Sequence, residues 1–501
     1  MHNNSGLVIG IDIGTGSTKA VSIDNTGSIL ASCQNHYPAD LTTEIQDPQI
    51  IVNSFISCLK EILFKTDKPV GTICLSSCMH SLMLVDENDT PLTDIITWSD
   101  SRASSVAANL RSEYGYVLYC ETGTPIHAMT PLCKICWFKD NQPDLFHRTK
   151  KFIGIKEFIW HQLFHSYEID YSIASATGLF NTQSLNWNPL SLQLAEITED
   201  QLSKIVPGGH SLKCNNQNPE YAFLNGINFM IGSSDGCLAN IGSGVISNDT
   251  AAITIGTSGA VRTTSTHPVN DYKNMLFNYV LEKDTIITGG PINNGGNTLK
   301  WLLNTYLQIS DPSEKQYLQL FEMVEQVPAG SNGLIFLPYL HGERAPIWDE
   351  LSTGAFIGIN ARHTTAHFLR AGLEGVCFAL SNILNILAQI QIINKINVSG
   401  GFINSPVWTQ ILSDITGKEI SIIHNEDSSA LGAAFFALKA NGIINNYDEI
   451  VRTPIKNYKP QSSNNKLYNQ YFDIYLKLYS TLQPITSALN LANVNSMNKK
   501  L

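Results

Sequence analysis

The stretch Gly10-Ile-Asp-Ile-Gly-Thr-Gly-Ser-Thr-Lys19 returns, with changes, as Ala252-Ile-Thr-Ile-Gly-Thr-Ser-Gly-Ala-Val261 in the second half of the chain. Each copy has the apolar, β-branched residues of a buried strand, followed by a turn of glycine and hydroxyl residues. Only the first copy carries an acid that could organise a metal ion, because Thr254 stands where Asp12 would repeat. The repeat predicts two halves of similar fold, and the single acid points to one nucleotide in one cleft.

The composition is typical of a globular protein with a large core. The 501 residues are 43% hydrophobic and 15% charged, which predicts roughly two to three folded domains. A net charge of −11 argues against a general nucleic-acid surface, so we expect no nucleic-acid partner. Ten scattered cysteines are typical of the reducing cytosol, and no secretory leader is visible, so we expect a cytoplasmic protein.

Two features have ordinary explanations. Cys133 and Cys136 have metal-site spacing, but no second pair or histidine cluster follows, so packing along one helical turn is the favoured interpretation. The chain has no charge between Glu374 and Lys395, which is nearly membrane length. Polar residues interrupt this stretch, so it predicts a buried helix between domains, and no membrane association.

Strands alternate with helices in both halves, which predicts a mostly parallel or mixed sheet in each, layered with helices. We expect a first domain over residues 1–243 and a second over residues 244–485. The tail 486–501 is rich in Asn and Lys and is expected to fray.

The first glycine turn is a candidate phosphate loop. Gly14 and Gly16 permit close approach of an anion, while Thr15, Ser17 and Lys19 add hydroxyl and ammonium donors. The pattern is neither a P-loop nor a dinucleotide fingerprint. Taken alone it is more often a simple turn, but the second copy at residues 256–259 favours phosphate binding.

Two further loops carry candidate chemistry. In Ser233-Ser-Asp235-Gly-Cys the acid follows a strand, where it could accept the proton of a hydroxyl nucleophile or, equally well, cap the next helix. In Ser399-Gly-Gly-Phe-Ile-Asn-Ser405 the paired glycines would let an adenine or ribose lie on the backbone, although a tight turn is the default interpretation.

Together these motifs resemble the FGGY family of carbohydrate kinases, which are similar in core to actin and the heat-shock chaperone ATPases. The segment from Met129 to Asn141 matches one family signature, and residues 354–374 resemble the other, with Gly372 where the family usually has a small side chain. The resemblance implies an α/β fold of two actin-like ATPase (ribonuclease H-like) domains with a central interdomain cleft. The first domain would bind mainly the sugar and the second mainly ATP.

The resemblance also implies roles for individual residues. Asp12 would organise Mg²⁺ through water, and Asp235 would be the general base beside the metal. Met79 and His80 match the substrate loop of the pentulose kinases, and Trp98 and Arg102 align with a segment beside the substrate. The residues expected to bind ATP are Gly14, Thr15, Gly16, Lys19, Gly256, Thr257, Gly296, Lys300, Gly401 and Ser405.

Three segments, at residues 122–129, 170–180 and 342–348, resemble gluconate kinases within the family. Their substrate carries a carboxylate, which needs a cation or several donors when it is buried. His127 lies in the first of these segments, in a His-Ala-Met run where the usual sequence is His-Pro-Met. The candidates for holding the carboxylate are His80, His127, Lys156 and Arg344; Lys134 ranks lower because it also occurs in relatives with neutral substrates.

The expected reaction is transfer of a phosphoryl group from MgATP to a sugar acid, namely D-gluconate, which gives 6-phosphogluconate. A xylulokinase or another pentulose or polyol kinase is the alternative within the same class. An actin-like chaperone or filament ATPase is the alternative from a different class. The expected partners are thus a small sugar acid and ATP, and the sequence leaves a homodimer open.

Overall fold

The structure, a computed structural model, describes residues 6–38, 44–245, 247, 249–423, 427–450 and 454–498. The chain forms two compact units. The first contains the described residues within 1–246, 264–288 and 426–452, and the second contains those within 247–263, 289–425 and 453–501. The first change of unit lies close to the expected boundary at residue 243, but the two later returns to the first unit were not predicted.

The first sheet is built around the strand of the opening repeat. Its strand order is β13-β14-β5-β1-β2-β3, with β1 antiparallel to β2 and parallel to β5. Because parallel strands end at the same edge, the acid of β1 and the loop after β14 come to one end of the sheet. The bounds are β1 (Leu7–Ile13), β2 (Ser17–Ile23), β3 (Ile29–His36), β5 (Val70–Ser77), β13 (Ser211–Lys213) and β14 (Asn228–Ser234).

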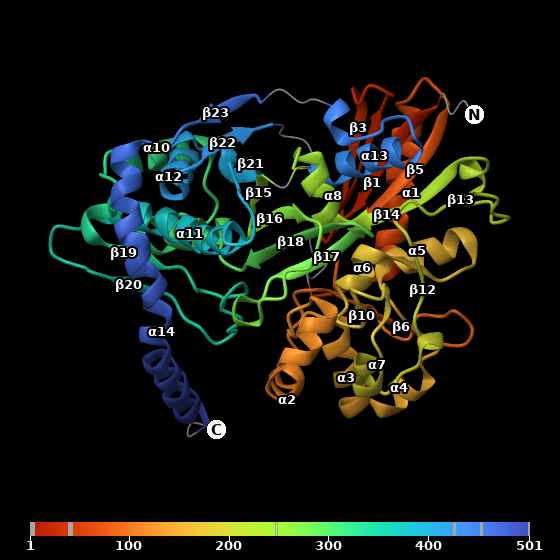
Figure 1. Cartoon of the computed structure of the whole chain (residues 1–501), viewed down its shortest axis with the longest axis horizontal. Helices are drawn as coiled ribbons and strands as arrows, with labels where there is room; N and C mark the ends of the chain where they lie inside the picture. Colours follow the sequence, from red (N-terminus) through yellow and green to blue (C-terminus); the bar gives the residue numbers. More distant parts are fainter. Residues whose placement is uncertain are drawn as a thin grey trace. The chain divides into compact units, whose positions relative to one another are not determined.

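Helix α13 (Ser428–Ala440) packs directly on β1 and against α8 (Asp235–Gly242), as Figure 1 shows. This approach requires Gly10, because a Cβ at that position would lie only 1.8 Å from the carbonyl oxygen of Ala430. Helix α1 (Pro48–Phe64) packs on β2 and β3. Thus a helix from near the end of the chain completes the core around its first strand.

The second sheet repeats this connectivity. Its order is β17-β18-β16-β15-β21-β22-β23, with β15 antiparallel to β16 and parallel to β21, as β1 is to β2 and β5. The prediction of two halves with similar fold is confirmed. The bounds are β15 (Thr250–Ile255), β16 (Gly259–Ser265), β17 (Phe277–Glu282), β18 (Thr285–Ile292), β21 (Lys395–Ser399), β22 (Glu419–Ile422) and β23 (Lys456–Tyr458).

The helices of the second unit surround a long apolar one. In the described part of the chain, only α11 (Thr365–Ala388) is long and apolar enough to cross a membrane, but 83% of its most apolar window is buried. It is therefore a buried core helix, packed on α9 (Gly296–Leu307), α12 (Pro406–Thr416) and β19 (Ile335–Leu337) of the same unit. A Cβ at Gly372 would lie 2.1 Å from Leu302 Cδ1, so the glycine lets α9 approach.

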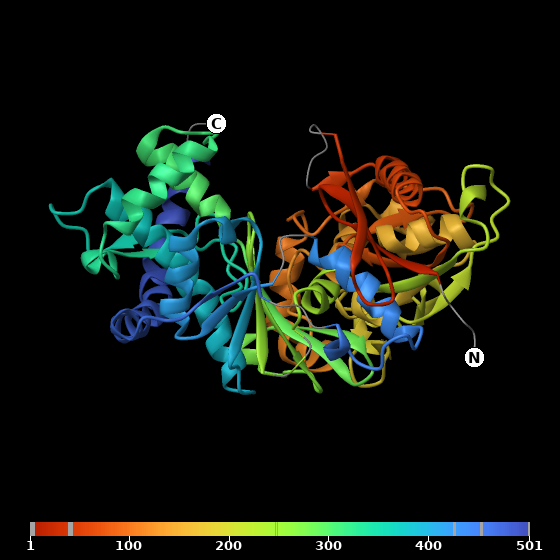
Figure 2. The same ribbon diagram turned by 90° about the horizontal axis from the view of Figure 1, so that it is seen from above.

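Two more helices complete this unit (Figure 2). Helix α10 (Glu314–Glu325) packs on α11 and α12. Helix α14 (Ser462–Asn498) continues past residue 486, where the sequence predicted fraying.

The first unit also carries an elaboration between β5 and β14. Cys133 and Cys136 are buried in its helix α3, and among the described residues no three His, Cys, Asp or Glu side chains are grouped to hold a metal. Its helices are α2 (Ser104–Thr122), α3 (Pro131–Asn141), α4 (Pro143–Arg148), α5 (Ile155–Phe164), α6 (Tyr171–Ser175) and α7 (Pro189–Ala195). Its strand pairs are β6 (Met83–Val85) with β8 (Lys151–Ile153), β9 (Glu168–Asp170) with β12 (Lys204–Val206), and β10 (Phe180–Asn181) with β11 (Asn186–Trp187). Its strand β7 (Ile95–Ile96) pairs with β4 (Ile45–Gln46), which precedes β5 in the chain.

Candidate active site

The turn between β1 and β2 is held from several sides. The Tyr37 hydroxyl donates to the carbonyl of Gly14 at 3.1 Å, and Gln46 Nε2 donates to the carbonyl of Thr15 at 2.8 Å. Trp98 Nε1 donates to the Thr15 hydroxyl at 3.2 Å. Gly16 at the tip is exposed, and a Cβ there would meet nothing within 4 Å. The turn is thus fixed in shape while its tip stays open, as a phosphate-binding turn requires.

Three carboxylates of the first unit interact near the end of β1. Asp12 is buried, and its Oδ1 accepts a 2.6 Å hydrogen bond from Ser76. Burial raises the pKa of Asp12 well above its usual value, and repulsion from Asp427 and Asp235 raises it further. A bound cation would relieve this repulsion.

The donor set fits Mg²⁺, which prefers oxygen ligands and keeps several waters. No cluster of three acidic, His or Cys ligands closes around one point among the described residues. The ion would therefore be held by Asp12 and Asp235 largely through water.

Lys19 pairs with Asp427, a residue to which the sequence assigned no role. The Nζ atom lies 2.5 Å from Asp427 Oδ2. Burial lowers the pKa of Lys19, but the Asp427 carboxylate outweighs burial and leaves that pKa raised. Asp427 is also the N-cap of α13, where it accepts from the backbone N–H groups of Ser429 and Ala430. Lys19, which is expected to bind phosphate, is thus charged and held at the start of α13.

Asp235 is the first residue of α8, but it is not the cap. Ser234 is the N-cap and accepts from the Cys237 N–H, so the capping role that the sequence left open for Asp235 belongs to its neighbour. Asp235 is partly exposed, and its Oδ1 accepts from the Gly236 N–H at 2.6 Å. The carboxylate of Asp235 is therefore held at Oδ1 by the backbone while the residue stays partly exposed.

A buried network supports the strand end that carries Asp235. Lys156 Nζ lies 2.7 Å from Asp170 Oδ2 and 3.0 Å from the carbonyl of Ser233. The Ser172 hydroxyl donates to Asp170 Oδ1 and accepts from the Ser234 N–H at 2.7 Å. Lys156, a candidate for binding the substrate carboxylate, is therefore already paired with Asp170.

The loop after β5 presents Met79 and His80, both buried. His80 Nδ1 lies 2.7 Å from the carbonyl of Ala176, so Nδ1 carries a proton and donates it. Its Nε2 lies 3.4 Å from the Tyr279 hydroxyl, and the Phe277 ring lies 5.2 Å from the His80 ring. The ring is fixed by its surroundings in one orientation.

His127 is partly buried, and its Nδ1 accepts from the Met129 N–H at 3.2 Å. A ring that accepts at Nδ1 is neutral and carries its proton on Nε2. Both candidate histidines thus have one nitrogen engaged with backbone.

Arg344 belongs to the second unit. It is buried, and its Nη2 donates to the carbonyl of Ile292 at 3.0 Å. The adjacent Glu343 accepts from the N–H groups of Asn293 at 2.6 Å and Arg344 at 2.8 Å. Burial raises the pKa of Glu343 to about 7. These contacts tie the Arg344 segment to the loop that starts α9; a contact with substrate stays a prediction.

The nucleotide residues expected in the second unit line one cavity of about 770 Å³. Two glycine loops approach closely here: the Gly296 N–H donates to the carbonyl of Gly256 at 2.7 Å, and a Cβ on Gly296 would lie 2.6 Å from that oxygen. Ser405 lies in the wall as the N-cap of α12. The expected residues in the lining are Gly256, Thr257, Gly296, Lys300, Gly401 and Ser405.

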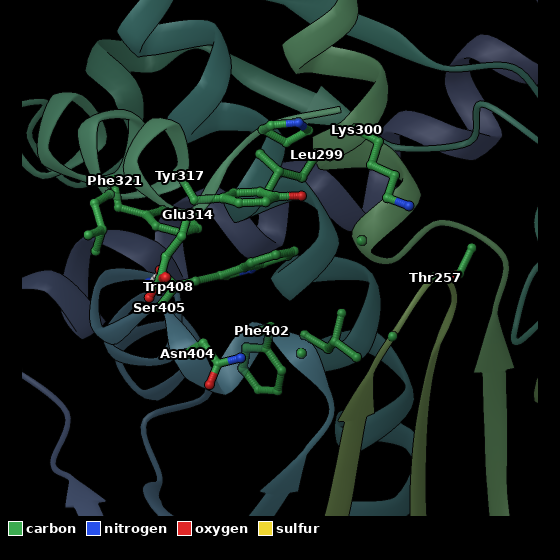
Figure 3. Close-up of a pocket in the computed structure, with 16 residues that line it drawn as sticks. Thr257, Leu299, Lys300, Glu314, Tyr317, Phe321, Phe402, Asn404, Ser405 and Trp408 are labelled. Atoms are coloured by element: carbon green, nitrogen blue, oxygen red, sulfur yellow. Dashed lines mark hydrogen bonds between the residues drawn. The ribbon is translucent and has the colours of Figure 1, made fainter. Parts of the chain in front are cut away.

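Sequence reasoning missed the apolar part of this cavity. Figure 3 shows Tyr317 and Leu299 on one side, and Phe402 and Asn404 on the other, with Trp408 between them. Tyr317 and Phe321 come from α10, one helical turn apart, a spacing that any amphipathic helix can show. A cavity of this volume with aromatic walls and a glycine-rich end can hold a purine base and place its phosphates at Gly256 and Thr257.

Comparisons with known proteins agree with this architecture. Residues 7–242 match the N-terminal domain and residues 251–441 the C-terminal domain of the FGGY family of carbohydrate kinases. A gluconokinase of Bacillus subtilis is 38% identical, over 95% of this chain and 96% of its own. A xylulose kinase of Staphylococcus epidermidis is 29% identical, over 96% and 98%.

Two solved structures from Lactobacillus acidophilus are each 32% identical to this chain. The gluconate kinase covers 95% of this chain and 98% of its own with a TM-score of 0.88. The ligand-bound xylulose kinase covers 96% and 99% with a TM-score of 0.90. The fold is therefore shared with kinases named for two different sugars.

Proposed function

The chain belongs to the FGGY family of carbohydrate kinases, and within that family we propose that it phosphorylates D-gluconate at its terminal hydroxyl, with ATP as the donor. The observation that carries gluconate over a neutral sugar is the 38% identity to a gluconokinase along 95% of the chain, against 29% for a xylulose kinase. The products would be 6-phosphogluconate and ADP.

Asp235 is the proposed general base. The sugar oxygen bonds to the γ-phosphorus as the bond from that phosphorus to the bridging oxygen of ADP breaks, and the hydroxyl proton passes to the carboxylate of Asp235. The position of Asp235 at a strand end, with one oxygen bonded to backbone, supports this role. Mg²⁺, when bound, would neutralise developing phosphate charge, while Thr15, Gly16 and Lys19 hold the phosphates.

Replacing Asp235 tests the base. We expect Asp235→Ala to keep its fold and its ATP affinity while kcat falls by ~10² or more, because proton transfer is lost. Circular dichroism, ATP titration and a coupled ADP-release assay measure these quantities. Asp284→Ala, in the exposed turn after β17, is the matched control and should keep full activity. A kcat near that of wild type in Asp235→Ala would contradict the assignment.

A substrate screen tests the sugar. The same assay with gluconate, xylulose, ribulose and glycerol should give the highest kcat/KM for gluconate. The alternative is a xylulose or other pentulose kinase, which the Met79-His80 pair and the TM-score of 0.90 to a xylulose kinase favour. Activity with a neutral sugar and none with gluconate would replace the first assignment by the second.

We also propose that the enzyme works in the cytoplasm. All ten cysteines are free thiols in the structure, and nine of them are buried, which is typical of a protein kept in a reducing compartment. A homodimer stays a prediction, which sedimentation velocity would check.

A further inference from the structure

We infer that Lys134 is a positioning residue: it fixes the backbone of the two segments that flank the sugar site, residues 79–81 (the sugar loop) and residues 96–98 (the tryptophan segment). This inference rests on the proposed sugar kinase activity, but it does not depend on which sugar is bound.

Lys134 lies in α3 and is fully buried. Its Nζ donates to three backbone carbonyls, those of His80 at 2.7 Å, Ile96 at 3.2 Å and Thr97 at 2.6 Å. An ammonium group has three protons, so all of them are used. Lys134 therefore has no proton left for a substrate carboxylate, and any effect on the sugar must act through the segments that it holds.

A buried ammonium is expensive to maintain, and burial lowers the pKa of Lys134 to about 7. Leu132, Cys133 and Ile135 beside it in the sequence are buried as well, so α3 is buried along this stretch. Hydrogen bonds to three carbonyl oxygens offset the cost of burying this ammonium group, and each of these oxygens would otherwise lack this donor. The three hydrogen bonds of the Lys134 side chain thus all go to backbone atoms.

The first of these carbonyls belongs to a residue in an unfavourable conformation. His80 has a φ of 64°, in the left-handed region that residues with side chains rarely adopt. Lys134 holds its carbonyl, while Ala176 holds its ring at Nδ1. With backbone and ring both anchored, the position of His80 Nε2 is determined.

The other two carbonyls precede Trp98. Ile96 pairs with Leu82 through backbone hydrogen bonds of 2.9 and 2.8 Å, which joins the tryptophan segment to the residue directly after the sugar loop. Trp98 in turn donates to the Thr15 hydroxyl in the phosphate turn. Lys134 therefore sits where the sugar loop and the segment that reaches the phosphate turn are joined.

Lys134→Met tests this role, because methionine fills similar space without donors. We expect the KM for the sugar to rise at least about tenfold, since a misplaced binding group loses its alignment, while the KM for ATP changes less than about twofold. Amide hydrogen exchange should become faster in peptides covering residues 78–98. The matched control is Lys139→Met on the same helix, whose Nζ contacts Leu194 and Glu196 at the surface; it should leave both KM values unchanged.

A double-mutant cycle that combines Lys134→Met with His80→Ala shows whether Lys134 acts through the sugar loop. In the His80→Ala background, Lys134→Met should raise the sugar KM much less than it does in wild type. If Lys134→Met gives no folded protein, the same measurements on Lys134→Gln decide, because the amide keeps two N–H donors in the site.

Three results would overturn the inference: a sugar KM within about twofold of wild type, equal increases in both KM values, or full additivity with His80→Ala. If wild type phosphorylates only a neutral sugar, that sugar is used in the same assays. The gluconate assignment then fails while the role of Lys134 is still decided.

Discussion

Ser172 offers a test of how Asp235, the proposed general base, is held in place. Its hydroxyl donates to Asp170 Oδ1 at 2.6 Å, and accepts from the Ser233 hydroxyl at 2.6 Å and from the Ser234 N–H at 2.7 Å. Ser172→Ala leaves the Ser234 N–H buried without this acceptor, which costs about 1–3 kcal/mol of unfolding free energy. Asp170 keeps its bonds from the N–H groups of Ser172 and Ile173, so the variant should still fold.

Because Ser234 directly precedes Asp235, a shift of its N–H moves the carboxylate. We expect kcat of Ser172→Ala to fall roughly tenfold with little change in the KM for ATP, since small displacements of a reacting group are costly. Urea unfolding gives the stability, and the coupled ADP-release assay gives the rates.

Ser191→Ala is the control for Ser172→Ala. Ser191 is equally buried and donates to the carbonyl of Gly178 at 2.8 Å, far along the chain from Asp235. It should lose comparable stability and keep its kcat. If Ser172→Ala is destabilised as expected but retains the kcat of wild type, the network supports the fold alone and the reasoning about Asp235 is wrong.

Two further predictions concern the second unit. Tyr317→Ala should raise the KM for ATP about tenfold without changing the KM for the sugar, because stacking of a nucleobase on an aromatic ring contributes about 1–3 kcal/mol. An unchanged KM for ATP in steady-state kinetics would show that Tyr317 does not bind the nucleobase. For Glu343, burial raises the folded pKa to about 7 from 4.5, so its neutral form is favoured in the folded protein and stability is lost as pH rises from about 4.5 through 7. The melting temperature of Glu343→Gln minus that of wild type should therefore rise over this range, and a difference independent of pH in thermal scans would contradict the shift.

The repeated strand and turn were enough to predict the two sheets, because strand period and turn chemistry are local properties. The six nucleotide residues expected in the second unit were found by resemblance, and they do line one cavity. Their glycines have a local signature, since close backbone contact excludes a Cβ, as at Gly296.

Other parts of the site had no such signature. Tyr317 on α10 is an aromatic residue at ordinary helical spacing, and its place in the cavity wall depends on the packing of α10 on α11 and α12. The pairing of Lys19 with Asp427 joins residues from opposite ends of the chain, and nothing local in either segment indicates it. The choice between base and cap for Asp235 also needed the structure, because Ser234 and Asp235 are both good caps by sequence.

The contact between Gly10 and α13 has a consequence for synthesis of the protein. The strand that is made first is covered by a helix made more than four-fifths of the way along the chain. The first unit therefore cannot complete its core on the ribosome until α13 has emerged, after residues 247–263 and 289–425 of the second unit have already been made. The second unit includes described residues within 453–501, which follow α13, so neither unit can complete its fold until the chain beyond residue 426 has been made.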